Sequence, residues 1–203
     1  MIAALMRWLA SMEAPREWPP RLRVSDRYAD VRLTNQFGRA IRFRSDLVRG
    51  RALVINSMFT TCRGSCPVTS RKVQELRAAL SPILGRRLSF ASFTVEPEVD
   101  TPERLREYAA AHGAAEPADG LCDWHFLTGA PGDIGRLRRS LGLYDLDPVV
   151  DADPTQHASL LMFGNGETDR WAALPAAQRT ALLVEAIRRV AGFTFEQRYG
   201  IRR

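Results

Sequence analysis

Apolar residues along the chain fall into short blocks whose spacing predicts a sheet. The run ALVINSMF and the run RLSFASFTV are nearly continuous in apolar and β-branched residues, which is typical of strands buried on both faces. Two segments predict β-hairpins, because apolar residues flank a turn at Asn35–Gly38 in the first and at Asn165–Gly166 in the second. The expected strands and hairpins therefore cover 30–43, 52–59, 87–95, 125–129 and 159–171.

Between these strands, apolar residues recur every three or four positions, which is typical of helices. Proline and acidic residues mark the helix starts, and glycine or proline marks the ends. Asp100–Glu103 is the clearest start, because it combines a cap residue, a proline for the first turn and an acid. The expected helices run from Pro67 to Pro82, from Pro102 to Gly113, from Asp133 to Leu141 and from about Pro175 to Val190.

This alternation of strands and helices predicts an α/β fold with a mixed central sheet and hairpins at each side. We expect a proline-containing lead-in segment over 1–25, one domain over 26–191 and a basic tail over 192–203 that is a frayed end or a docked strand. Residues 113–123 contain no periodic pattern and are expected to form an irregular loop.

Composition narrows the class of partner. With 45% hydrophobic and 26% charged residues in 203, the chain is typical of a globular protein. The net charge is +6, but the arginines are scattered and no zinc-finger, RNP or basic-zipper pattern accompanies them. We therefore expect no nucleic-acid partner.

No run of residues has the length and apolar character of a membrane span. The opening MIAALMRWLASMEAP is interrupted by Arg7 and makes a poor secretory signal. It is compatible with a weak or truncated membrane anchor, or with an amphipathic helix.

The residues with the most distinctive chemistry are Cys62 and Cys66, in the segment FTTCRGSCP. They follow a predicted strand and open a predicted helix, so a spacing of four should place both sulfurs on the same side. The positive end of the helix dipole favours thiolate, which is the form that binds metals and attacks disulfides. A disulfide between the two cysteines is an alternative form. Cys122 stands in the irregular loop and is expected to have no role, with transient redox pairing as the alternative.

Two thiolates rarely complete a metal site, so the three histidines are candidates for a third ligand. His112 is expected to cap a helix as a cation, and His125 to lie at the edge of the core. His157 follows a loop rich in Asp and Pro and precedes a strand, which is where ligands tend to lie in α/β folds. Position alone does not separate a ligand from a structural histidine here.

Four blocks of sequence together resemble the Sco/SenC family. They are TTCRGSCP at 60–67, VEPEVDTPERL at 95–105, WHFLTG at 124–129 and TQH at 155–157. The resemblance implies a thioredoxin-like fold with an added hairpin. It also implies a role in delivering copper to the dinuclear copper site of cytochrome c oxidase, or in reducing the cysteines of that site.

The same resemblance implies a mononuclear site for Cu(I) or Cu(II) with Cys62, Cys66 and His157 as ligands. Glu96 departs from the family, which usually has aspartate at that position. By resemblance, the expected partner is the copper-site subunit of the oxidase or another copper or thiol protein. The expected location is the cell envelope.

Three other functions are compatible with part of this pattern. A thiol–disulfide reductase would use Cys62 and Cys66 without metal and would not need His157. A peroxidase of this fold class has proline seven residues and threonine three residues before its reactive cysteine. Ile55 and Phe59 stand at these positions before Cys62, which argues against a peroxidase. A structural zinc site would be one ligand short of its closed set of four.

Overall fold

The described residues form one mixed seven-stranded sheet in the order β2-β1-β5-β4-β3-β6-β7. The computed structural model describes residues 22–114, 116–153 and 159–201. β3, β4 and β5 are parallel neighbours, and every other pairing in the sheet is antiparallel. The strands are β1 (Arg32–Asn35), β2 (Ala40–Arg42), β3 (Ala52–Met58), β4 (Leu88–Thr94), β5 (Asp123–Thr128), β6 (Leu160–Asn165) and β7 (Arg170–Pro175).

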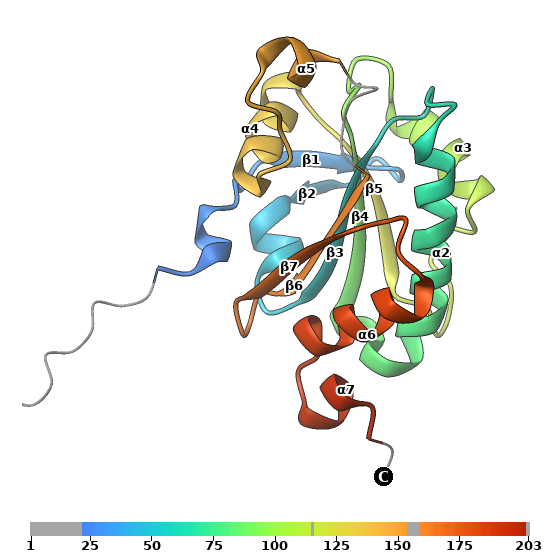
Figure 1. Ribbon diagram of the computed structural model, residues 1–203. Coiled ribbons are helices and arrows are strands. Elements are labelled where there is room, and N and C mark those ends of the chain that lie inside the picture. Colours follow the sequence, from blue (N-terminus) through green and yellow to red (C-terminus); the bar gives the residue numbers. More distant parts are fainter. Residues whose placement is uncertain (1–21, 115, 154–158, 202–203) are drawn as a thin grey trace, which may run out of the picture.

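Helices cover both faces of this sheet (Figure 1). They are α2 (Ser65–Leu84), α3 (Pro102–Ala111), α4 (Pro131–Leu141), α5 (Pro148–Ala152), α6 (Thr180–Ala191) and α7 (Phe195–Tyr199). Single turns of 3-10 helix lie at Val24–Arg27 and Gly85–Arg87, and one turn of π-helix lies at Phe43–Val48. The α/β fold with a mixed sheet and an N-terminal hairpin is therefore confirmed.

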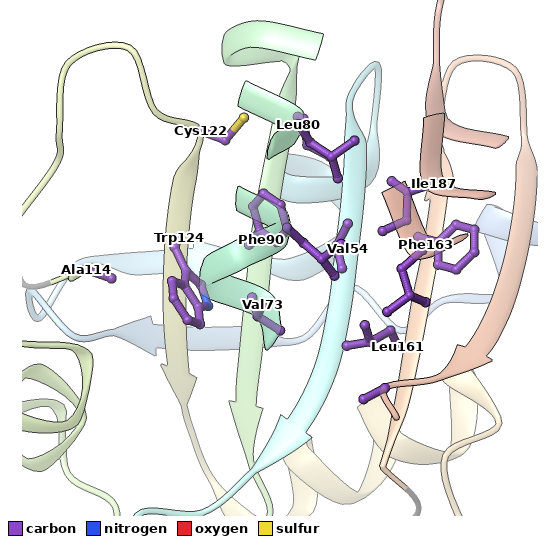
Figure 2. Close-up of a cluster of buried hydrophobic side chains, with 14 of the residues drawn as sticks. Val54, Val73, Leu80, Phe90, Ala114, Cys122, Trp124, Leu161, Phe163 and Ile187 are labelled. Carbon is purple, nitrogen blue, oxygen red and sulfur yellow. The ribbon is translucent and has the colours of Figure 1, made fainter. Parts of the chain in front are cut away.

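Two hydrophobic cores form because successive strand residues point to opposite faces of the sheet. On one face, side chains from the strands pack against α2, α3 and α6, and Figure 2 shows a part of this cluster. Its members include Val54, Phe90, Trp124, Phe163, Val73, Leu80 and Ile187. On the other face, the intervening strand residues pack against α4 and the π-helical turn; this cluster includes Leu53, Ile55, Phe93, Phe43, Leu47, Ile134 and Leu137.

The sheet topology brings three connections to one edge. The carboxyl ends of the parallel strands β3 and β4 lie level, with Met58 opposite Thr94. Just beyond them, the Val95 N–H donates to the Met58 carbonyl at 2.9 Å. Because β6 is antiparallel to β3, its first residue, Leu160, lies at this same edge. The segment after β3, the segment after β4 and the segment before β6 therefore converge.

Several predicted boundaries were wrong. α2 continues past Pro82 to Leu84, because Leu84 reaches the core and one proline removes only one helical hydrogen bond. α6 begins at Thr180 because β7 continues to Pro175, where a helix start was expected. The segment expected to be a frayed end or a docked strand contains the short helix α7.

No helix in the described part of the chain is long and apolar enough to cross a membrane.

Candidate metal centre

The two cysteines lie at the convergent edge, at the junction of β3 and α2. The prediction that both stand on one turn of helix is wrong for Cys62, because α2 begins at Ser65 with Gly64 as its N-cap. Their thiols are nevertheless in hydrogen-bond contact. All three cysteines of the chain are described, and none forms a disulfide.

The surroundings of Cys62 favour its thiolate. Partial burial alone would raise the pKa of this thiol. Hydrogen bonds from the Cys66 thiol and from the N–H groups of Cys66, Gly64 and Ser65 outweigh burial, so the pKa of Cys62 is lowered. These N–H groups belong to the N-cap residue and the first turn of α2, where backbone N–H groups have no acceptor within the helix.

Cys66 is different, because it is only 2% exposed. Burial raises the pKa of the Cys66 thiol, and its hydrogen bond to Cys62 and the nearby charge of Asp100 raise it further. The pair therefore consists of a half-buried thiol whose pKa is lowered and a buried thiol whose pKa is raised.

Two threonines before Cys62 are held by two carboxylates from the segment between β4 and α3. The Thr60 N–H donates to Asp100 Oδ2 at 3.1 Å, and its hydroxyl also donates to that carboxylate. The Thr61 hydroxyl donates to Glu96 Oε2 at 2.8 Å. Glu96, the residue that departs from the family pattern, therefore contacts the cysteine segment despite its extra methylene.

Two adjoining hollows lie at this edge of the sheet. The larger has a volume of about 410 Å³ and is lined by Glu96, Pro97, Glu98, Pro131 and other residues. The smaller, about 150 Å³, lies between Ser57 and the segment before β6. Arg138 and Asp151 line both hollows and form an ion pair at 2.6 Å, which ties α5 to α4.

His157, the expected third ligand, lies outside the described residues. Asp153 and Leu160, on either side of it in sequence, both line the smaller hollow. Among the residues that the structure describes, no three His, Cys, Asp or Glu side chains group in a way that could hold a metal ion.

The other two histidines have structural surroundings. His112 does cap α3, but it is 8% exposed and packs against Tyr108. The cap position is confirmed, but burial and the charge of Arg71 lower the pKa of His112, which disfavours the cation expected there. His125 lies half-buried in β5, as expected for the edge of the core, and burial lowers its pKa too.

Cys122 directly precedes β5, whose first residue pairs with Ser89 at the start of β4, so it lies at the opposite end of the parallel strands from the site; Figure 2 shows it in the core. It is 1% exposed, and its thiol donates to the Gly85 carbonyl at 3.2 Å. Burial raises the pKa of this thiol. The side chain therefore behaves as a small core residue.

The fold and site define a class of protein: a thioredoxin-like domain with a cysteine pair at the junction of a strand and a helix. The model of the SCO1/SenC family matches residues 23–192. The chain belongs to that family.

Curated and solved relatives agree with this assignment. A candidate copper-binding protein of Stutzerimonas stutzeri is 28% identical over 114 residues, 56% of this chain and 50% of that protein. The chain thus spans about half the length of the curated relatives it matches.

Solved structures support the fold. A SCO1/SenC family lipoprotein from Bacillus anthracis superposes with a TM-score of 0.62 at 21% identity, covering 79% of this chain and 92% of that one. ScoI of Bradyrhizobium japonicum with copper bound gives 0.61 at 22% identity, covering 78% and 96%.

The sequence predicts that Cys62 and Cys66 lie on the same side of the strand-to-helix junction, but it does not predict the hydrogen bonds that hold the segment before them. It did not identify Thr60 or Asp100, which lie in the family-like blocks but carry no signal that they touch. Asp100 was interpreted only as part of a helix start, although the N-cap is Thr101 and Asp100 is fully buried.

Proposed function

We propose that this chain is a copper metallochaperone that binds one copper ion through Cys62, Cys66 and His157. The observation that carries the proposal is the contact between the Cys62 and Cys66 thiols at the start of α2, where N–H groups stabilise thiolate. Soft sulfur ligands favour Cu(I), and imidazole suits copper in both oxidation states.

The topology favours His157 as the third ligand. Leu160 is three positions further along the chain, so chain length alone keeps the two Cα atoms within roughly 11 Å of each other. Leu160 lies at the convergent edge, where it lines the smaller hollow opposite Ser57 near the end of β3. His112 and His125, the other histidines, have the structural surroundings described above.

Three protein ligands leave a coordination position open, through which a partner's ligand can enter and take the metal. Both thiols must be reduced to bind copper, so loading depends on the redox state of the pair. Membership of the SCO1/SenC family supports the copper-site subunit of cytochrome c oxidase as the recipient. We also propose a cell-envelope location, since the similar Bacillus anthracis protein is a lipoprotein.

A second candidate function is thiol–disulfide reduction, which the unequal acidity of the two thiols favours. The Cys62 thiolate would attack a partner disulfide and release one partner thiolate. Cys66 would then lose its proton and attack the mixed disulfide. The partner would leave as a dithiol, and Cys62 and Cys66 would be left joined as a disulfide.

A competitive Cu(I) titration of the reduced protein against a coloured chelator tests the proposal. Wild type is compared with Cys62→Ser, Cys66→Ser and His157→Ala, and Cys122→Ser is the matched control. We expect one tight equivalent that weakens in the three ligand variants and persists in Cys122→Ser.

Wild-type binding no tighter than that of Cys62→Ser would refute copper delivery and leave reduction as the function. Unchanged affinity in His157→Ala alone would keep the thiolates as ligands and overturn the histidine assignment.

A further inference from the structure

α7 carries an exposed aromatic face. Phe195 is 60% exposed and Tyr199 is 55% exposed, and their ring centroids lie 4.5 Å apart. A spacing of four on a helix places the two rings side by side. Ile201, which follows them, is 51% exposed. Exposing such an apolar cluster to water is unfavourable in free energy, so a partner that covers it is expected.

Fraying of the chain does not explain this exposure, because α7 is fixed in its orientation. Its N-terminus has a complete capping box formed by Thr194 and Gln197. Gln197 Nε2 also donates to the Ile83 carbonyl at the end of α2, at 3.2 Å. The polar glutamine thus faces the body of the protein while Phe195 and Tyr199 face solvent, which is the reverse of an ordinary surface helix.

Arginines surround this face. Arg87 lies over the Phe193 ring at 3.4 Å, Arg198 donates to the Phe193 carbonyl, and Arg188 lies against Gly200. Over residues 185–203 the sequence contains five arginines and two glutamates, and one of these glutamates, Glu185, pairs with Arg189. Such a positive surface repels a second copy of itself and attracts an anionic partner.

α7 lies beside the C-terminal end of α2, and the cysteines lie at the start of that helix (Figure 1). α2 separates them, with Ser65 at one end and Ile83 near the other, and its 20 residues span about 30 Å. A flat surface that covered α7 would therefore leave Cys62 accessible.

We propose that this patch, formed by Phe195, Tyr199, Ile201 and the arginines Arg87, Arg188 and Arg198, docks on an anionic lipid surface. Aromatic side chains on a short helix favour the head-group region of a bilayer, where one side is apolar and the other wet. Arginines beside them bind anionic head groups through a field that salt screens. The proposal does not depend on copper binding, so either can fail alone.

Co-sedimentation of the full chain with phosphatidylcholine–phosphatidylglycerol vesicles tests it, with pure phosphatidylcholine vesicles for comparison. The variant is Phe195→Ser/Tyr199→Ser. The matched control is Leu146→Ser/Val149→Ser, which removes two apolar side chains that are 88% and 78% exposed near α5.

We expect the α7 variant to bind mixed vesicles at least about tenfold more weakly than wild type, since two aromatic side chains leave the interface. The control should bind as wild type does. Arg188→Gln/Arg198→Gln should also weaken binding to mixed vesicles, and binding should decrease as salt rises. Thermal melting of each variant checks that the fold is kept.

Equal binding of wild type and the α7 variant would overturn the proposal and assign any membrane affinity to another part of the chain. Wild-type binding that is absent, or equal on both kinds of vesicle, would also overturn it. A wild-type dimer in sedimentation equilibrium that the α7 variant abolishes would identify a second copy as the occupant instead.

Discussion

Thr60 and Asp100, forty residues apart in sequence, are joined through both the backbone N–H and the hydroxyl of Thr60. The Thr94 hydroxyl donates to the same carboxylate at 2.5 Å. Asp100 is fully buried, so these donors replace the water that would otherwise solvate its charge. The end of β4 and the segment before Cys62 are thus fixed by one carboxylate.

Replacing this carboxylate should be costly. Asp100→Ala leaves several buried donors without an acceptor, and we expect a loss of about 3 kcal/mol in the free energy of unfolding. Asp100→Asn keeps an acceptor oxygen and should lose less. Urea denaturation measures both, and Glu98→Ala, an exposed acid in the same segment, is the control.

A double-mutant cycle then tests whether the contact with Thr60 carries the effect. If Asp100→Ala and Thr60→Ala add without coupling, the carboxylate acts elsewhere and the cysteine segment is not held by it.

The three cysteines should differ in reactivity. Because the pKa of Cys62 is lowered and those of Cys66 and Cys122 are raised, iodoacetamide near pH 7 should label Cys62 first. Cys66→Ala removes a hydrogen bond to the Cys62 thiolate, so labelling of Cys62 should shift to higher pH. Peptide mass spectrometry across a pH series follows each site.

Cys122→Ala is the control for this experiment, since its side chain lies in the core away from the pair. Faster labelling of Cys66 than of Cys62 would contradict the assignment of the thiolate.

The main strands could be predicted because burial on both faces leaves a nearly continuous apolar run, as in β3 and β4. The start of α3 and the end of α4 could be predicted because proline and glycine act locally there. Gly142 adopts the left-handed conformation that ends α4, for example. These features depend on neighbours in sequence.

The errors depend on distant contacts. Pro82 was expected to end a helix, but packing of Leu84 in the core continues it. His112 was expected to cap α3 as a cation, but it lies in the core near Trp124, where burial lowers its pKa. The contact between Thr60 and Asp100 depends on the parallel register of β3 and β4, which no local pattern encodes.

Gly166 should be intolerant of a side chain. A Cβ at this position would lie 1.8 Å from the Val48 carbonyl oxygen, which belongs to the backbone and cannot swing away. We expect Gly166→Ala to lower the free energy of unfolding by about 2 kcal/mol or more.

Gly135→Ala in α4 is the matched control for this glycine, because a Cβ there meets open space. It should raise stability by about 0.5–1 kcal/mol, since alanine favours helix. Equal effects at the two positions would show that the contact with Val48 does not limit Gly166.

The buried His112 and the half-buried His125 should make the fold less stable in acid. The pKa values of His112 and His125 are lowered in the fold, mainly by burial. The unfolded chain, with a histidine pKa near 6.5, therefore binds protons at a higher pH than the folded chain does. Stability is full above about pH 6.5 and decreases as pH falls toward the folded values, by at most about 1.4 kcal/mol per pH unit for each histidine.

Urea denaturation between pH 7.5 and pH 5 measures this loss of stability. In this range a carboxyl such as Asp30, whose pKa is about 2, stays ionised in the fold. His112→Phe keeps a ring against Tyr108 and removes the titration, so its stability should decrease less over this range. Since His125 still titrates, a smaller slope should remain in that variant. An unchanged slope in His112→Phe would mean that His112 already takes up its proton in the folded state, and that burial does not keep it neutral.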